Sequence, residues 1–260
     1  MPKVVELSKL KYDLNKKFTT PDGSEYAPGN LILWTRADES KEFDDQGSGE
    51  HNVTCLLPMS RPNSGPLDNS NLNNLRSAVQ LSQDGSDGTS VSIADKADLS
   101  FGDGSSSDTA FSFSLWIKLT DVSSTSTLIQ KFGLSGYEYV VYWEGAASVL
   151  HARLYKNNNP AQYLGFSASA TLVANEWTHI VFTYSASGTT TNRGVLYLNG
   201  SALSTTGADA SSYNFMAPGS QPVRVGTLAD LASDLQNQES SFYEFAIWSG
   251  RVLSATDVAA

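Results

Sequence analysis

The sequence is poor in the features that identify several large classes of protein. It has one cysteine, Cys55, so no disulfide forms within the chain and a disulfide-stapled secreted module is excluded. No apolar run approaches the roughly 20 residues of a membrane-spanning helix. Residues 1–18 also hold no apolar core of the kind found in signal peptides. We therefore expect no membrane partner and no use of the general secretion route.

Basic residues are scarce as well. The 17 Lys and Arg are outnumbered by 27 Asp and Glu, which gives a net charge of −10. Because phosphate binding needs clustered cations, nucleic acid is not an expected partner. The exception is the first 17 residues, which carry five lysines, Lys3, Lys9, Lys11, Lys16 and Lys17. Either this basic arm docks on an acidic partner or it is a solvated tail.

What the sequence does have is alternation of apolar and polar residues. In the segment 111–118, Phe111, Phe113, Leu115 and Ile117 fall on one face, and serines, Trp116 and Lys118 fall on the other. This period of two is typical of a strand with one buried face. Further predicted strands are Leu31–Trp34, Ser90–Ile93, Thr127–Lys131, Glu138–Trp143, Val149–Tyr155, Thr178–Tyr184, Gly194–Leu198, Val223–Val225 and Phe242–Trp248. So many strands with turns between them indicate a sandwich or barrel.

Two local signals are sharper. Asn199-Gly200 lies between two alternating runs, and this pair favours a type I′ hairpin because both central residues need positive φ. Near the C-terminus, Ser254 can cap a helix over 255–260, with Asp257 three residues on to complete a capping box.

Several segments, taken in order, resemble the laminin-G-like and pentraxin-like jelly rolls of the concanavalin A-like superfamily. The most recognisable is Glu176–Tyr184, which is similar to the family's Trp-x-His-Val-x-x-Thr-Tyr strand. The others are Asn30–Trp34, Ala78–Leu81, Gly88–Ile93, Phe111–Lys118, Thr127–Lys131, Tyr137–Tyr142, Leu196–Gly200, Val223–Gly226 and Tyr243–Trp248. The resemblance implies an all-β, antiparallel two-sheet jelly-roll sandwich over residues 30–260, preceded by an N-terminal arm over residues 1–29.

Catalytic patterns are missing. Sandwich glucanases of this superfamily carry a Glu-x-Asp-x-(x)-Glu run that places carboxylates on one strand face, as two-carboxylate glycoside hydrolysis requires. The chain has no such run, and its three histidines, His51, His151 and His179, lie far apart in sequence. We expect His179 to be a packed structural residue, and we predict that the protein is not an enzyme.

Calcium is the cofactor that the resemblance suggests, since many members of the family bind it at a sheet edge or rim. Oxygen ligands suited to it occur in two places. One would pair Asp45 with Glu244, and the other is the loop 230–239 with Asp230, Asp234 and Glu239. The alternative is that these are solvated acidic loops. No other cofactor is expected.

Aromatic residues beside polar ones could bind sugars by stacking. The candidates are Trp116, Tyr137, Tyr139, Trp143 and Tyr163. Trp116 is distinctive because it lies opposite the apolar face of its strand. For each of them the alternative is ordinary packing in the core.

Three functions fit this sequence. The first is a virion surface or decoration protein of a tailed phage, capsid or tail, made in the host cytoplasm and anchored to other virion proteins through residues 1–29 as a homo-oligomer or multi-copy assembly. It rests on fold-level association. The second is a carbohydrate-binding lectin module of an extracellular or cell-surface bacterial adhesin. The third, a glycan-cleaving enzyme, is disfavoured. The first two can coexist, because a virion protein can bind surface polysaccharide.

Overall fold

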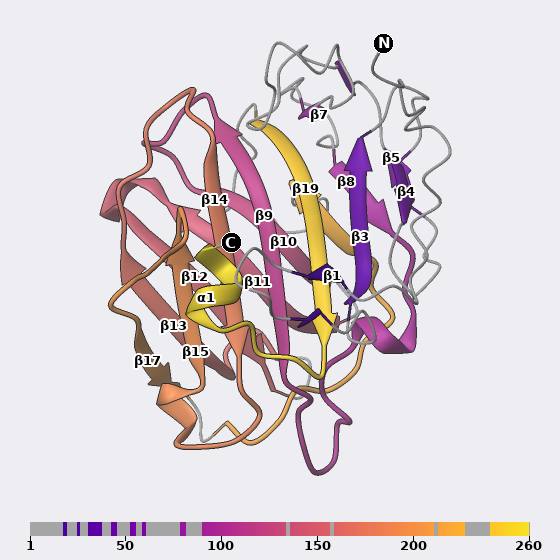
Figure 1. Ribbon diagram of the computed structural model, residues 1–260. Helices are drawn as coiled ribbons and strands as arrows, with labels where there is room; N and C mark the ends of the chain where they lie inside the picture. The colour runs from indigo at the N-terminus through magenta and orange to yellow at the C-terminus, as the bar shows by residue number, and fades with distance from the viewer. Residues whose placement is uncertain are drawn as a thin grey trace.

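The computed structural model describes residues 90–133, 136–156, 159–210, 213–226 and 240–259, together with short strands before residue 90. All paired strands are antiparallel, and all but one short pair of strands form two facing sheets (Figure 1). The predicted all-β sandwich is therefore confirmed.

The front sheet in Figure 1 follows the order β16 (Ser201–Ala202), β15 (Gly194–Leu198), β14 (Thr178–Tyr184), β9 (Phe111–Leu119), β19 (Ser240–Ser249), β3 (Leu31–Ala37), β4 (Phe43–Asp45). The back sheet follows the order β17 (Thr206–Asp209), β13 (Tyr163–Ser169), β12 (Val149–Tyr155), β11 (Gly136–Glu144), β10 (Ser126–Gly133), β18 (Val223–Gly226), β8 (Ser90–Ile93), β5 (Val53–Cys55). Outside these orders, β6 (Met59–Ser60) pairs with β7 (Val79–Leu81), which also pairs with β19, and β1 (Phe18–Thr19) pairs with β2 (Glu25–Tyr26).

Each of the ten predicted strands lies within an observed one, and β13 is the principal strand that the prediction missed. Its outward positions hold Gly165 and serines, residues that are common in turns. The described part of the chain also contains one helix, α1 (Ala255–Ala259), and three short 3₁₀ turns, Ala97–Leu99, Gly145–Ala147 and Thr190–Asn192.

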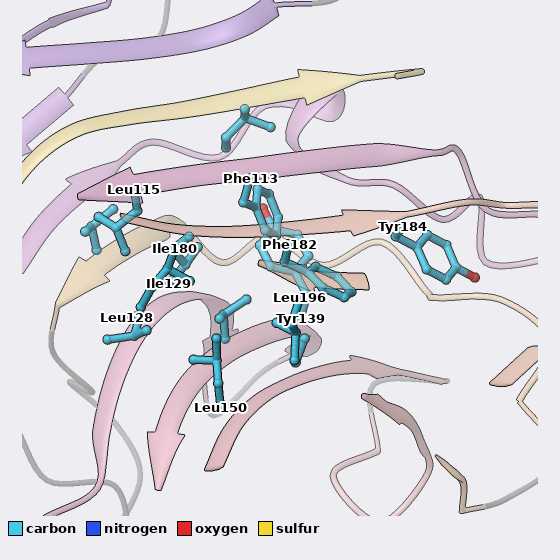
Figure 2. Packing of buried hydrophobic residues seen from close by; sticks show 14 of the residues in the cluster. Phe113, Leu115, Leu128, Ile129, Tyr139, Leu150, Ile180, Phe182, Tyr184 and Leu196 are labelled. Atoms are coloured by element: carbon cyan, nitrogen blue, oxygen red, sulfur yellow. The ribbon is translucent and has the colours of Figure 1, made fainter. Parts of the chain in front are cut away.

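The core fills the space between the two sheets. The predicted apolar face of β9 is confirmed, since Phe111, Phe113, Leu115 and Ile117 are each at most 2% exposed. Figure 2 shows the labelled Phe113 and Phe182 of the front sheet converging on Tyr139 and Leu150 of the back sheet. Burial of this apolar surface is the main term that stabilises the sandwich.

Two β-bulges in the back sheet change which side chains face the core. The register between β10 and β11 skips Leu128 on one strand and Glu138 on the other. An extra residue of this kind lets two consecutive side chains point the same way. Leu128 and Ile129 both enter the core as a result, and Glu138 turns inward to contact the buried Lys131.

The two local predictions are also confirmed. Asn199 and Gly200 have φ values of 48° and 80° in the turn between β15 and β16. At α1, the backbone N–H of Asp257 donates to Ser254 Oγ at 3.2 Å, and that of Ser254 donates to Asp257 Oδ2 at 2.7 Å. The helix packs on the outer face of the front sheet, where Val258 joins the buried residues of β14 and β15 (Figure 1). No helix within the part of the chain that the structure describes is long and apolar enough to cross a membrane.

Candidate functional site

The outer face of the back sheet carries a second group of large side chains. On β11, β12 and β13, alternate residues such as Val141, Ala152 and Phe166 belong to the main core. The residues between them therefore point to the opposite face. They include Tyr142, His151, Arg153, Tyr155 and Tyr163. Tyr142 and Tyr155 belong to a separate apolar cluster with Phe132 and Val140, against which Tyr137 and Tyr163 pack.

Four of these side chains form a continuous stack across three strands, which we call the outer-face stack: Tyr163, Arg153, Tyr142 and His151. The guanidinium carbon of Arg153 lies 4.6 Å from the ring centroid of Tyr163 and 5.1 Å from that of Tyr142. His151 lies on Tyr142 with centroids 4.6 Å apart, and its Nε2 is 2.9 Å from Glu144 Oε2. Such cation–π and ring–ring contacts fix the orientation of all four groups.

Strand β13 leaves room for this stack because residue 165 is glycine. Gly165 lies opposite Arg153 in the register of β12 and β13. A Cβ at Gly165 would be only 3.1 Å from the ring of Tyr163. The missing side chain therefore allows the Tyr163 ring to lie close to the sheet with Arg153 over it.

The charge states of the stack follow from its partial burial. Burial lowers the pKa of His151, against the opposing effect of Glu144, so the imidazole is neutral at pH 7. Burial also raises the pKa of Tyr142 to about 12, and the hydroxyl stays protonated. Arg153 is half-buried, and no carboxylate pairs with it among the residues that the structure describes.

Two of the five predicted sugar-binding residues lie on this face. Tyr163 is part of the outer-face stack, and Tyr137 lies beside Phe132 and Tyr155 with ring centroids 5.8 and 5.6 Å away. Both are partly exposed. The structure thus brings Tyr137 and Tyr163 to one surface.

The predictions for Tyr139 and Trp143 are wrong. Their side chains are 0% and 1% exposed and belong to the main core. The Tyr139 hydroxyl donates to the carbonyl of Leu99, and Trp143 Nε1 donates to that of Val122. With every face of the ring packed and each polar atom bonded, neither residue can stack on a sugar.

Trp116 lies on the other side of the molecule, on the outer face of the front sheet. It stacks on His179 with ring centroids 4.9 Å apart, and His179 Nε2 is 2.9 Å from Ser114 Oγ. His179 is therefore packed as predicted. Trp116 and Tyr163 are on opposite outer faces and do not contribute to one site.

Sequence reasoning missed Tyr142, His151, Arg153 and Tyr155 as candidates. Three of them recur at period two along the predicted strand Val149–Tyr155. Large planar side chains at every second position, on the face away from the core, were the available signal.

The structure describes no side chain of the predicted calcium ligands or of the arm lysines. Asp230, Asp234 and Glu239 lie outside the described residues, as do Lys3, Lys9, Lys11, Lys16 and Lys17. Asp45 and Glu244 are described by backbone alone, on β4 and β19 with β3 between them. Within the described ranges, no group of three or more His, Cys, Asp or Glu could hold a metal ion. Calcium therefore stays a prediction.

Known structures share this sandwich. The binding domain of paraclostridial mosquitocidal protein 1 superimposes with a TM-score of 0.64 at 15% identity, over 89% of this chain and 51% of that domain. The binding domain of botulinum neurotoxin DC, in complex with SialylT, gives 0.62 at 14% identity, over 89% and 50%. The same toxin domain in complex with rat synaptotagmin II gives 0.62 at 15% identity, over 89% and 51%.

The chain thus spans about half the length of these binding domains, and the low identity shows a shared fold alone. No curated protein matches the sequence. A family model does match, over residues 85–259, and it is described as the concanavalin A-like lectin/glucanases superfamily. The match covers most of the chain and all of the outer-face stack, and it agrees with the predicted resemblance. The chain belongs to the concanavalin A-like lectin/glucanases superfamily, as one of its laminin G domains.

Proposed function

We propose that the protein is a carbohydrate-binding module that binds polysaccharide on the outer-face stack. The observation that carries this proposal is the stack itself: four planar side chains held in register on the face of the sheet that is turned away from the core. The core does not require them, since the main cluster is complete on the other face.

The chemistry of the stack suits a sugar. A pyranose ring has an apolar face that packs on an aromatic ring, and hydroxyl groups that accept and donate hydrogen bonds. Tyr163 offers a partly exposed ring at one end, while Arg153 offers N–H donors beside it. A shallow surface of this kind binds one sugar unit weakly, so useful affinity comes from repeated contacts along a polymer.

A binding role without bond cleavage is supported by two further points. The similar solved structures described above are binding domains. Among the described residues, the carboxylate that contacts the stack is that of Glu144, and its Oε2 lies 2.9 Å from His151 Nε2. We expect size-exclusion chromatography of a bound polysaccharide to show no shortening after prolonged incubation.

The biological setting is a separate proposal. Anchoring of many copies to a virion through residues 1–29 and display on a cell surface are both compatible with polysaccharide binding. In the virion setting, deletion of residues 1–29 yields a folded monomer that no longer assembles, as seen by analytical ultracentrifugation. Loss of folding on this deletion would contradict the separation of arm and sandwich.

The proposed function is tested with the full chain on a polysaccharide array, followed by calorimetric titration of each polymer that binds. Tyr163→Ala removes the ring and Tyr163→Phe keeps it. We expect the first to weaken binding about tenfold and the second to change it little, because stacking uses the ring. Trp116→Ala, on the opposite face, is the control for position and is expected to bind like the parent chain. Equal affinity of the parent and Tyr163→Ala, or binding that depends on Trp116, would refute the proposed site.

A further inference from the structure

Arg153 is a cation in an unusual setting. Its guanidinium lies between two tyrosine rings on the outer face of the back sheet. Two other basic side chains are paired with acids, Lys131 with Asp95 and Glu138 and Arg251 with Asp257. Arg153 pairs with no carboxylate in the described part of the chain. In a protein with 27 acidic residues, an arginine held in place by rings instead of by an acid stands out.

The contacts of Arg153 leave its hydrogen-bonding edge available. A guanidinium that lies over an aromatic ring uses its face, whereas its five N–H donors point outward in its plane. One of these donors bonds Tyr155. Burial raises the pKa of Tyr155, although the charge of Arg153 and its hydrogen bond oppose the rise. The remaining donors have the planar fork that matches a carboxylate with two parallel hydrogen bonds.

We propose that the polysaccharide bound by the outer-face stack carries carboxylate groups, and that Arg153 binds one of them while Tyr163 packs on the same or the adjacent sugar ring. This inference rests on the proposed function and adds the chemical class of the ligand. Because the rings hold the guanidinium before the ligand arrives, little side-chain freedom is lost on binding.

The overall charge of the protein makes this preference diagnostic. With a net charge of −10, the molecule as a whole repels polyanions. At physiological salt the repulsion is screened beyond about 8 Å, whereas a direct ion pair at the stack survives. Preference for an acidic polymer therefore reports a specific contact instead of general attraction.

The test compares polygalacturonate with its methyl ester, which has the same sugar backbone without the charges, by calorimetric titration in 150 mM salt. A sulfated galactan serves as a second polyanion. We expect the parent chain to bind polygalacturonate at least tenfold more tightly than either of the other two. Arg153→Gln removes this preference. Arg153→Lys retains only part of it, because the ammonium lacks the planar fork. Thermal unfolding of each variant checks that the fold is retained.

The outcomes separate the two proposals. Equal binding of the acid and the ester, still lost in Tyr163→Ala, overturns the carboxylate inference and leaves carbohydrate binding intact. Equal binding of the sulfated polymer also overturns it. If Arg153→Gln does not fold, the titration is repeated on the parent chain with free galacturonate or free galactose as competitor. Competition by galacturonate and not by galactose supports the inference. Absence of binding to every polysaccharide refutes the proposed function and the inference together.

Discussion

His151 lies almost parallel to Tyr142, with ring centroids 4.6 Å apart and planes inclined by 8°. The two residues face each other directly in the register of β11 and β12. Because Arg153 covers the same tyrosine from a position two residues further along β12, Tyr142 is held by two neighbours from one strand. The order of the outer-face stack is thus set by strand pairing.

This relationship predicts the effect of replacing His151. His151→Ala removes a ring contact worth about 0.5–1.5 kcal/mol, which frees Tyr142 and weakens polysaccharide binding roughly threefold to tenfold. His151→Phe keeps a ring on Tyr142 and loses only the bond to Glu144. We expect it to bind nearly as well as the parent chain in calorimetric titration. Equal losses in both variants would show that the bond to Glu144, and not the ring, positions the stack.

Gly165 gives a second test of the same geometry. A Cβ at this position would lie 3.1 Å from the Tyr163 ring, so Gly165→Val displaces the ring and the guanidinium above it. We expect at least a tenfold loss of affinity with little change in the midpoint of thermal unfolding. Ser169→Val, four residues along the same face of β13 and opposite Val149, is the matched control and keeps its affinity. Unchanged affinity in Gly165→Val would argue that the position of Tyr163 is unimportant.

The sandwich was predictable because its strands alternate over long segments, as in Phe111–Leu119, and because the Asn199-Gly200 turn has few alternatives. The candidate site was harder to predict from the sequence. Tyr137 and Tyr139 are two residues apart, and simple alternation places them on the same face. The bulge at Glu138 separates them, so that Tyr137 packs on Phe132 outside and Tyr139 enters the core.

Bulges depend on pairing with a neighbouring strand, and a single strand's sequence does not reveal them. The outer-face stack raises the same difficulty in another form. Its members come from β11, β12 and β13, and they meet only through the register of these strands. Each strand alone shows a polar face with one or two rings, which is also what a solvated face looks like.

Because His179 is largely buried, we expect the stability of the fold to depend on pH. Burial lowers its pKa from 6.5 to about 4, so the unfolded chain binds the proton more readily than the folded one between these values. The contribution to stability is therefore complete above pH 6.5 and is lost as the pH falls toward 4, by up to about 3 kcal/mol. His179→Gln has no titrating ring. We expect urea unfolding to show a smaller loss of stability between pH 7 and 4.5 in this variant, whereas parallel losses would contradict the assignment.

The buried pair of Lys131 and Glu138 predicts the largest loss of stability. Their side chains are 0% and 1% exposed, and Lys131 Nζ also donates to Ser100 Oγ and the Gly219 carbonyl, both at 2.9 Å. Lys131→Met leaves the carboxylate buried without its cation, which costs about 3–5 kcal/mol. Lys118→Met is the control, since Lys118 is partly exposed over the Trp177 ring and its loss costs less than about 1 kcal/mol.

The pH dependence of this loss identifies its cause. Burial raises the pKa of Glu138, and the Lys131 charge opposes that rise. In Lys131→Met the pKa of Glu138 is raised further, so the folded variant takes up a proton that the unfolded chain releases. The loss in Lys131→Met is therefore smaller at pH 5 than at pH 8, and urea unfolding at both values measures it. Adding Glu138→Leu to Lys131→Met removes the buried charge and restores part of the stability. If the single variant loses the same amount at both pH values, the loss comes from packing and not from the buried carboxylate.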